Sequence, residues 1–256
     1  MNRIEKLFKT KDTNILSVYF TAGYPKLDDT VIVLKELQKQ GVDMVEIGIP
    51  FSDPMADGPV IQHSSTVALR NGMSLRYLFS QLQDIRNDIH IPLVLMGYLN
   101  PIMQYGFEAF CQSCRNTGID GVIIPDLPFD DYMQSYKAVA EEYGINVIML
   151  ITPETSEERI HLIDQNTKGF IYMVSSASTT GVQQSFDDAK TEYFNRINNM
   201  KLQNPRLVGF GISNKATFDA AAKYACGGII GSKFVDLLNK HDASEAVREL
   251  VTALKN

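Results

Sequence analysis

The sequence predicts an α/β fold, a single (β/α)8 TIM barrel with a short capping helix at its N-terminus. The chain has 256 residues, a size typical of such barrels. Short apolar runs rich in β-branched residues alternate with longer segments of helical periodicity, as in the βαβ units of a parallel sheet. No tract rich in Gly, Ser or Pro divides the chain, so one domain over residues 1–256 is expected.

Eight apolar runs are the expected strands, and eight such units in one domain favour a closed barrel over an open sheet. They are residues 16–21, 43–47, 92–96, 121–124, 146–150, 169–174, 206–209 and 228–231. Helical segments lie between them. Residues 29–40, for example, carry Val31, Leu34 and Leu37 on one face and stop at Gly41, which favours a helix C-terminus.

The N-terminus and the cysteines indicate a cytoplasmic protein. Residues 1–11 carry apolar side chains at helical spacing but lack the apolar core of a targeting peptide. No apolar run approaches the roughly 18 residues of a membrane span. The three cysteines are an odd number, read as reduced thiols, and Cys111 and Cys114 are expected one turn apart in a helix. Cys226 does not complete a zinc-binding set with them.

The net charge of -6 argues against a nucleic-acid partner. The four histidines are scattered without ligand spacing, so no metal site is expected. Phosphate-loop, Ser-hydrolase and zinc-protease motifs are missing as well. Acid–base chemistry by carboxylates is the class of catalysis that remains.

Residues 45–59 are the most informative segment, because an apolar strand leads into a Pro-stiffened loop that holds acids. By the two-residue period of a strand, Glu46 shares a face with Met44 and Gly48, so its carboxyl is expected among apolar neighbours. Burial there would raise its pKa toward neutrality, as a proton-transferring group requires. The alternative is a strand Glu paired with a lysine.

Barrel ligands bind at the C-terminal ends of the strands. Phe20, Ile61 and Tyr98 near these ends could line an apolar pocket for a flat aromatic molecule, although each alone could be core packing. The last two strands lead into Gly209 to Ser213 and Gly227 to Ser232, where glycine backbone and a helix N-terminus could bind phosphate. Tight turns are the alternative interpretation of these glycines.

The segment from Val45 to Pro59 resembles the signature of the tryptophan synthase α subunit family, an apolar-Glu-apolar-Gly strand end followed by Pro-Phe-Ser-Asp-Pro-apolar-Ala-Asp-Gly-Pro. The resemblance implies retro-aldol cleavage of indole-3-glycerol phosphate to indole and glyceraldehyde 3-phosphate. Glu46 would move the protons and Asp57 would accept the indole N–H bond. Tyr172 would orient Glu46, or would be a core tyrosine with a satisfied hydroxyl. The backbone at four positions would hold the phosphate: Gly181, Gly211, Gly231 and Ser232.

The resemblance also implies a partner, a pyridoxal-phosphate (PLP) β subunit in an αββα heterotetramer that receives the indole. This chain itself would hold no cofactor. The expected contacts with the partner are Asp53, Pro54, Asn100 and Pro101. One departure from the family is the loop at residues 175–181, which lacks the usual Arg and inner Gly, so its closure and its coupling to the partner are open.

Two rival hypotheses remain at this stage. Another phosphate-binding barrel lyase or isomerase would share the glycine elements, but it would not need the paired Glu46 and Asp57. An interaction subunit without activity would be expected to have lost one of those two acids, and the chain has both.

Overall fold

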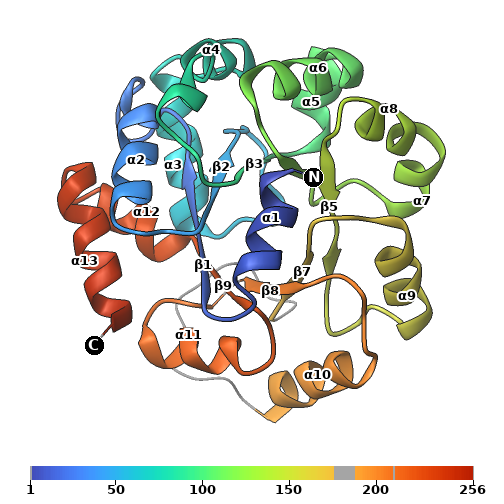
Figure 1. The fold of residues 1–256 in the computed structure, drawn as a ribbon. Helices are drawn as coiled ribbons and strands as arrows, with labels where there is room; N and C mark the ends of the chain where they lie inside the picture. The colour runs from blue at the N-terminus through green and yellow to red at the C-terminus, as the bar shows by residue number, and fades with distance from the viewer. Residues whose placement is uncertain (1, 176–187, 210, 256) are drawn as a thin grey trace.

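A ring of parallel strands surrounded by helices forms the fold in the computed structural model, which describes residues 2–175, 188–209 and 211–255 (Figure 1). Within these ranges the sheet order is β5-β4-β3-β2-β1-β9-β8-β7-β6. The strands are β1 (Ile15–Thr21), β2 (Met44–Gly48), β3 (Leu93–Met96), β4 (Gly121–Ile123), β5 (Asn146–Ile148), β6 (Leu150–Ile151), β7 (Ile171–Val174), β8 (Arg206–Gly209) and β9 (Gly227–Ile230). Every pairing is parallel.

The helices form the outer ring, except for α1 (Figure 1). They are α1 (Arg3–Thr10), α2 (Asp29–Lys39), α3 (Pro59–Arg70), α4 (Leu75–Gln81), α5 (Leu99–Tyr105), α6 (Phe107–Thr117), α7 (Phe129–Asp131), α8 (Lys137–Glu142), α9 (Glu157–Asn166), α10 (Asp188–Asn199), α11 (Lys215–Ala222), α12 (Ser232–Leu238) and α13 (Ala243–Lys255). A 3-10 turn, η1 (Ile85–Asn87), precedes β3, and a π-helical turn, η2 (Tyr132–Tyr136), joins α7 to α8.

The predicted barrel is confirmed, and its expected strands are found within two residues of the predicted bounds, with one difference. The run expected at 146–150 is divided at Met149 into β5 and β6, which pair with different neighbours. The amide of Tyr172 donates to the Met149 carbonyl at 3.0 Å. The two ends of the sheet are therefore consecutive in the chain, and the chain itself closes the ring.

Alternation along the strands separates two apolar layers. Val18, Phe20 and Ile47 belong to the large buried cluster that also contains helix residues, between the barrel and its outer ring. Met44 and Tyr172 belong to the smaller cluster that fills the barrel interior. The even and odd positions of one strand thus face different surroundings, and the inward positions decide the chemistry of the interior.

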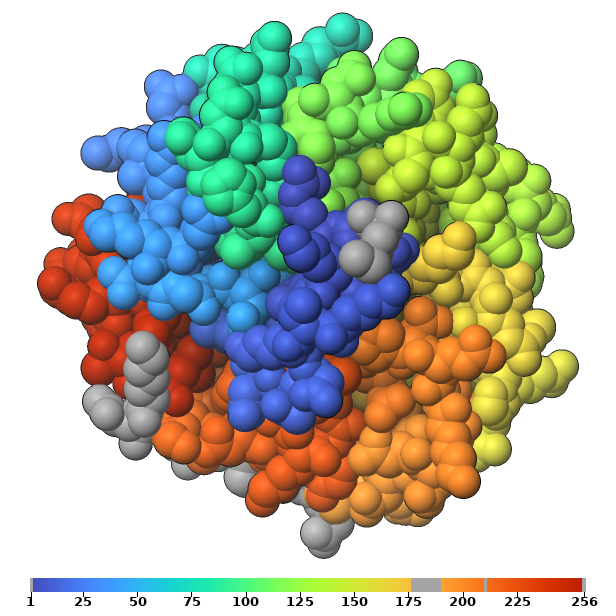
Figure 2. All heavy atoms as spheres, in the orientation of Figure 1, coloured from blue at the N-terminus to red at the C-terminus, as the bar shows by residue number. Residues whose placement is uncertain are grey.

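Helix α1 closes the N-terminal end of the barrel, as the capping helix was predicted to do. Ile4 is fully buried with the interior cluster, and the rings of Phe8 and Phe170 lie 5.9 Å apart. Figure 2 shows these first residues in dark blue at the centre of this face. Asp120, nearly buried, anchors the helix: its carboxylate pairs with Arg3 at 3.1 Å and with Arg86 at 2.7 Å.

The cysteine prediction is confirmed, since Cys111 and Cys114 are free thiols buried on α6. Burial raises the pKa of the Cys111 thiol to about 12, which makes it a poor nucleophile. Across the part of the chain that the structure describes, no helix has both the length and the apolar character needed to cross a membrane.

Candidate active site

Glu46 lies on β2 with its side chain in the barrel interior and with 0% of its surface exposed. Its Oε1 accepts a hydrogen bond of 3.1 Å from the Ser17 hydroxyl on β1. The lysine pairing considered above is not found: the ion pairs among the described residues do not include Glu46. Burial raises the pKa of Glu46 to about 8, and the bond from Ser17 opposes that shift.

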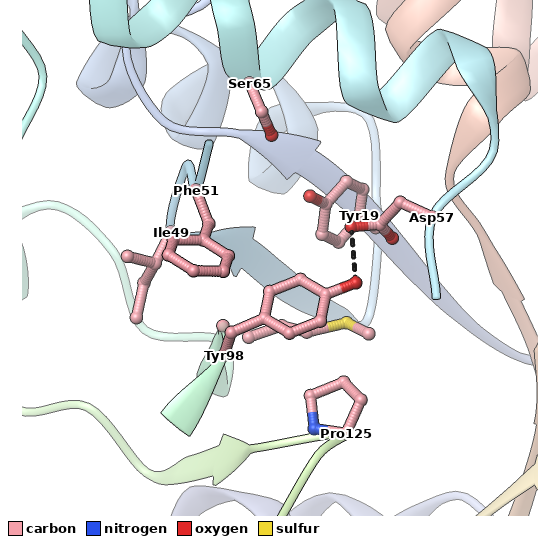
Figure 3. A pocket seen from close by; sticks show the side chains of 9 residues that line it. Tyr19, Ile49, Phe51, Asp57, Ser65, Tyr98 and Pro125 are labelled. Atoms are coloured by element: carbon pink, nitrogen blue, oxygen red, sulfur yellow. Dashed lines mark hydrogen bonds between the residues drawn. The ribbon is translucent and has the colours of Figure 1, made fainter. Parts of the chain in front are cut away.

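Asp57 lies in the loop between β2 and α3, and Tyr98 fixes its position (Figure 3). The Tyr98 hydroxyl donates to Asp57 Oδ2 at 3.0 Å and accepts from the Ala56 amide at 2.9 Å. Gln62 on α3 donates to the Asp57 carbonyl at 2.8 Å. Burial raises the pKa of Asp57, and the bond from Tyr98 lowers it. One phenol from the end of β3 thus fixes the position of this acid and opposes the rise in pKa that burial causes.

A narrow pocket opens beside this pair at the C-terminal ends of the strands (Figure 3). Its lining combines aromatic, apolar and polar side chains: Tyr19, Ile49, Phe51, Asp57, Ser65, Met96, Gly97, Tyr98 and Pro125. The rings of Phe51 and Tyr98 lie 5.4 Å apart. The site therefore offers flat apolar surface together with a carboxylate, which suits an aromatic ring that carries an N–H.

Tyr172, to which the resemblance assigns the orientation of Glu46, is buried on β7 in the interior. Burial raises the pKa of its phenol, and the neighbouring Glu46 and Asp57 raise it further. The ring fits because β8 ends in a glycine: a Cβ on Gly209 would overlap the Tyr172 Oη. A Cβ on Gly48 would likewise overlap the Tyr19 Oη.

The prediction that Phe20 lines the pocket is wrong, because the inward position on β1 is that of Tyr19. Phe20 is fully buried in the cluster between barrel and helices. The sequence contains a signal for Tyr19, since Ser17, Tyr19 and Thr21 give one face of β1 a polar character that its other face lacks. Ile61 is buried on α3 in the same outer cluster.

The glycine elements follow β8 and β9, which are neighbours in the sheet. Gly211 has φ +76°, a conformation that favours glycine. Gly231 directly precedes Ser232, the first residue of α12. A Cβ on Gly231 would come no nearer than 3.4 Å to the protein, so its own packing does not require glycine there. Gly181 and most of the loop at 175–181 lie outside the described residues.

The loop that carries Asp57 also forms part of the surface at this end of the barrel. Asp53 and Asn100 are exposed, and Pro54 and Pro101 are partly exposed. Among large apolar side chains, Met55 has 87% of its surface exposed. The four residues predicted to contact a partner are therefore accessible. Asp53 and Pro54 are close in sequence to Asp57, and Asn100 and Pro101 are close to Tyr98.

Barrel and site together define a class of protein: a (β/α)8-barrel enzyme with a carboxyl of raised pKa buried in the barrel interior and a second acid of raised pKa at the C-terminal strand ends. Comparison with known proteins narrows the class. The model of the family described as tryptophan synthase alpha chain matches residues 6–256. The chain belongs to this family.

Curated relatives and solved structures agree. The tryptophan synthase alpha chain of Parabacteroides distasonis is 66% identical over 256 residues, and that of Phocaeicola vulgatus 64% over 258, each covering 100% of both chains. A solved Mycobacterium tuberculosis tryptophan synthase has a TM-score of 0.89 at 30% identity, covering 99% of this chain and 96% of that one. The Legionella pneumophila alpha subunit gives 0.87 at 34%, covering 100% and 97%.

Members of this family are lyases of tryptophan biosynthesis that cleave indole-3-glycerol phosphate and assemble with a β subunit in an αββα heterotetramer. The activity and the partner that the resemblance implied are thereby confirmed at the level of the family. The alternative of another phosphate-binding lyase or isomerase finds no support.

Proposed function

We propose that Glu46 carries the protons and Asp57 binds the indole N–H during cleavage of indole-3-glycerol phosphate by this single-domain chain. The observation that carries the proposal is the complete burial of Glu46, which raises its pKa to about 8, in the same barrel end as Asp57. A carboxyl whose pKa lies near the working pH can both give and take a proton.

The proposed reaction recycles one proton. Near pH 7 the raised pKa keeps Glu46 mainly protonated, and it donates this proton to C3 of the indole ring. The bond between C3 and the glycerol side chain then breaks, and its electron pair restores the aromatic indole. The side-chain hydroxyl carbon becomes the aldehyde of glyceraldehyde 3-phosphate. The proton of that hydroxyl passes to Glu46, which returns to its starting state.

Asp57 acts on the intermediate. Protonation of C3 places positive charge on the ring and its nitrogen, and a fixed carboxylate accepting the N–H bond stabilises that charge. A preorganised group of this kind is worth about 3 kcal/mol. The bond from Tyr98 favours the charged form of Asp57 that this role requires. Tyr172, buried beside both acids, restricts where Glu46 can move.

The substrate phosphate would bind at the ends of β8 and β9. Gly211, Gly231 and Ser232 stand at adjacent strand ends, where backbone amides can approach an anion without an intervening side chain. Gly181 is assigned to the same site by the family resemblance alone. Tyr98, which lines the pocket, would contact the ring. The same role for Ile61 on α3 rests on the sequence alone.

Binding of the β subunit would use the surface formed by Asp53, Pro54, Asn100 and Pro101. We place the cofactor PLP in that partner and none in this chain, and we place the chain in the cytoplasm. The sequence supports these assignments through the interpretation of its cysteines as reduced thiols and through the family resemblance.

The test is release of indole by Glu46→Gln in the presence of β subunit. The amide keeps the side-chain shape but cannot exchange protons, so turnover should vanish while a phosphate-bearing indole analogue still binds. Because burial raises the folded pKa of this acid, its ionised form costs stability as pH rises through about 8. The Gln variant should therefore unfold no earlier than wild type at pH 9, and appreciable residual turnover would sink the proposal.

A further inference from the structure

The two oxygens of Glu46 have different surroundings. Oε1 accepts from the Ser17 hydroxyl at 3.1 Å, and both residues have 0% exposure. Oε2 is buried and has no hydrogen-bond partner among the described residues. Buried polar oxygens are nearly always bonded, so an open one in an enzyme marks a place for a ligand group.

Strand register explains how Ser17 reaches only one oxygen. In the pairing of β1 with β2, Tyr19 lies beside Glu46, and Ser17 lies beside Met44. Ser17 is therefore one inward position nearer the N-terminal end of the barrel than Glu46. Since barrel ligands approach from the C-terminal end, Ser17 holds the carboxyl from the side opposite to the substrate.

We propose that Ser17 is a positioning residue for the lyase reaction, which fixes Oε1 of Glu46 as an acceptor and so keeps the transferable proton on Oε2. This inference rests on the proposed role of Glu46. In a protonated carboxyl, the oxygen that accepts a hydrogen bond from a fixed hydroxyl is the carbonyl oxygen. The proton is then carried by the second oxygen, which is Oε2 in Glu46. Without Ser17 the carboxyl could rotate and carry its proton on either oxygen.

The remaining neighbours of Glu46 do not supply the same constraint. Tyr19 on β1, Tyr172 on β7 and Asp57 in the loop are the titratable groups that face this region, and both phenols feel the charge of both acids. On β3, the residue paired with Glu46 is the apolar Val94. Of the hydrogen bonds among the described residues, the one from Ser17 is the one that reaches Glu46.

The experiment compares Ser17→Thr with Ser17→Val, two side chains of matched shape of which only Thr has the hydroxyl. Each variant is assayed with β subunit for kcat and KM from pH 6 to 10. We expect Ser17→Val to lose about tenfold or more in kcat, the usual effect of a lost bond to an ionisable group, with KM within about twofold. The fall of kcat at alkaline pH should move upward, because the Ser17 bond lowers the Glu46 pKa. Ser17→Thr should stay close to wild type.

The outcomes separate the two proposals. Equal impairment of Thr and Val variants, or a Val variant with wild-type kcat and pH profile, would overturn the positioning role. Ser17→Ala, which removes the hydroxyl without adding a methyl group, gives the same comparison should Val reduce the folded fraction. An active Glu46→Gln would instead overturn the proposed function itself, whatever Ser17 does.

Discussion

Replacing Tyr98 by Phe removes a single oxygen that joins Asp57 to the backbone of its own loop. That hydroxyl donates to Asp57 Oδ2 at 3.0 Å and accepts from Ala56 at 2.9 Å. A bond to a charged group contributes about 1.5–3 kcal/mol, and each 1.4 kcal/mol is about tenfold in rate. We therefore expect kcat/KM for indole release to fall roughly ten- to a hundredfold, with the fold retained because the ring still packs on Phe51.

The pH profile of the Tyr98→Phe variant shows in which direction the pKa of Asp57 changes. In the proposed reaction Asp57 acts as a carboxylate, so activity should be present above its pKa and should be lost as pH falls through it. The Tyr98 bond lowers that pKa, and without it the acid limb of kcat/KM should move to higher pH. Tyr143→Phe is the control, since its hydroxyl bonds Glu108 at the surface. A Tyr98→Phe enzyme within twofold of wild type at every pH would refute the reasoning.

Three further predictions concern stability, phosphate binding and the partner. Asp120→Ala should destabilise the fold by about 3 kcal/mol or more in denaturant unfolding, because it leaves the charge of Arg86 without its partner. Asp130→Ala breaks an exposed ion pair with Arg159 and should cost under about 1 kcal/mol. Equal losses in the two variants would contradict this expectation. In Gly231→Ala the new Cβ would lie 3.4 Å from the Tyr19 ring, an ordinary contact, so the melting temperature should change little. The methyl group should crowd the phosphate site and raise the substrate KM. An unchanged KM would remove Gly231 from that site. We expect the isolated chain to cleave its substrate slowly and a β subunit to accelerate it. Asp53→Ala should leave the rate of the isolated chain unchanged and remove most of that acceleration, and full acceleration would argue against this contact.

The sequence predicted the barrel well because its signals are local. Alternating apolar runs and helix stops such as Gly41, observed at φ +83°, depend on residues near one another in the chain. Glu46 was predictable for the same reason, since the strand period alone places its carboxyl on the apolar, inward face of β2. The strand period applied to β1 indicates Tyr19 instead of Phe20, because Tyr19 is paired with Glu46 and Phe20 with Ile47.

The parts that could not be predicted are those made by long-range contacts. Tyr98 and Asp57 are 41 residues apart, and Ser17 and Glu46 are 29 apart. No periodicity links such pairs, because strand register and loop path bring them together only in the folded chain. The break of the fifth run at Met149 is likewise a long-range property, because it depends on pairing with β4 on one side and with β7 on the other.

Closure of the ring through Met149 limits how this protein can associate with others. A strand with an open side invites another chain to add itself by backbone hydrogen bonds, which also promotes aggregation. Here the first and last strands of the sheet order are successive pieces of one chain, so the barrel offers no long free strand for such pairing among the described residues. Recognition of a second protein is then expected to use side chains on loops and helices instead of strand addition. One of these loops, between β2 and α3, carries Asp57 close in sequence to the exposed Asp53.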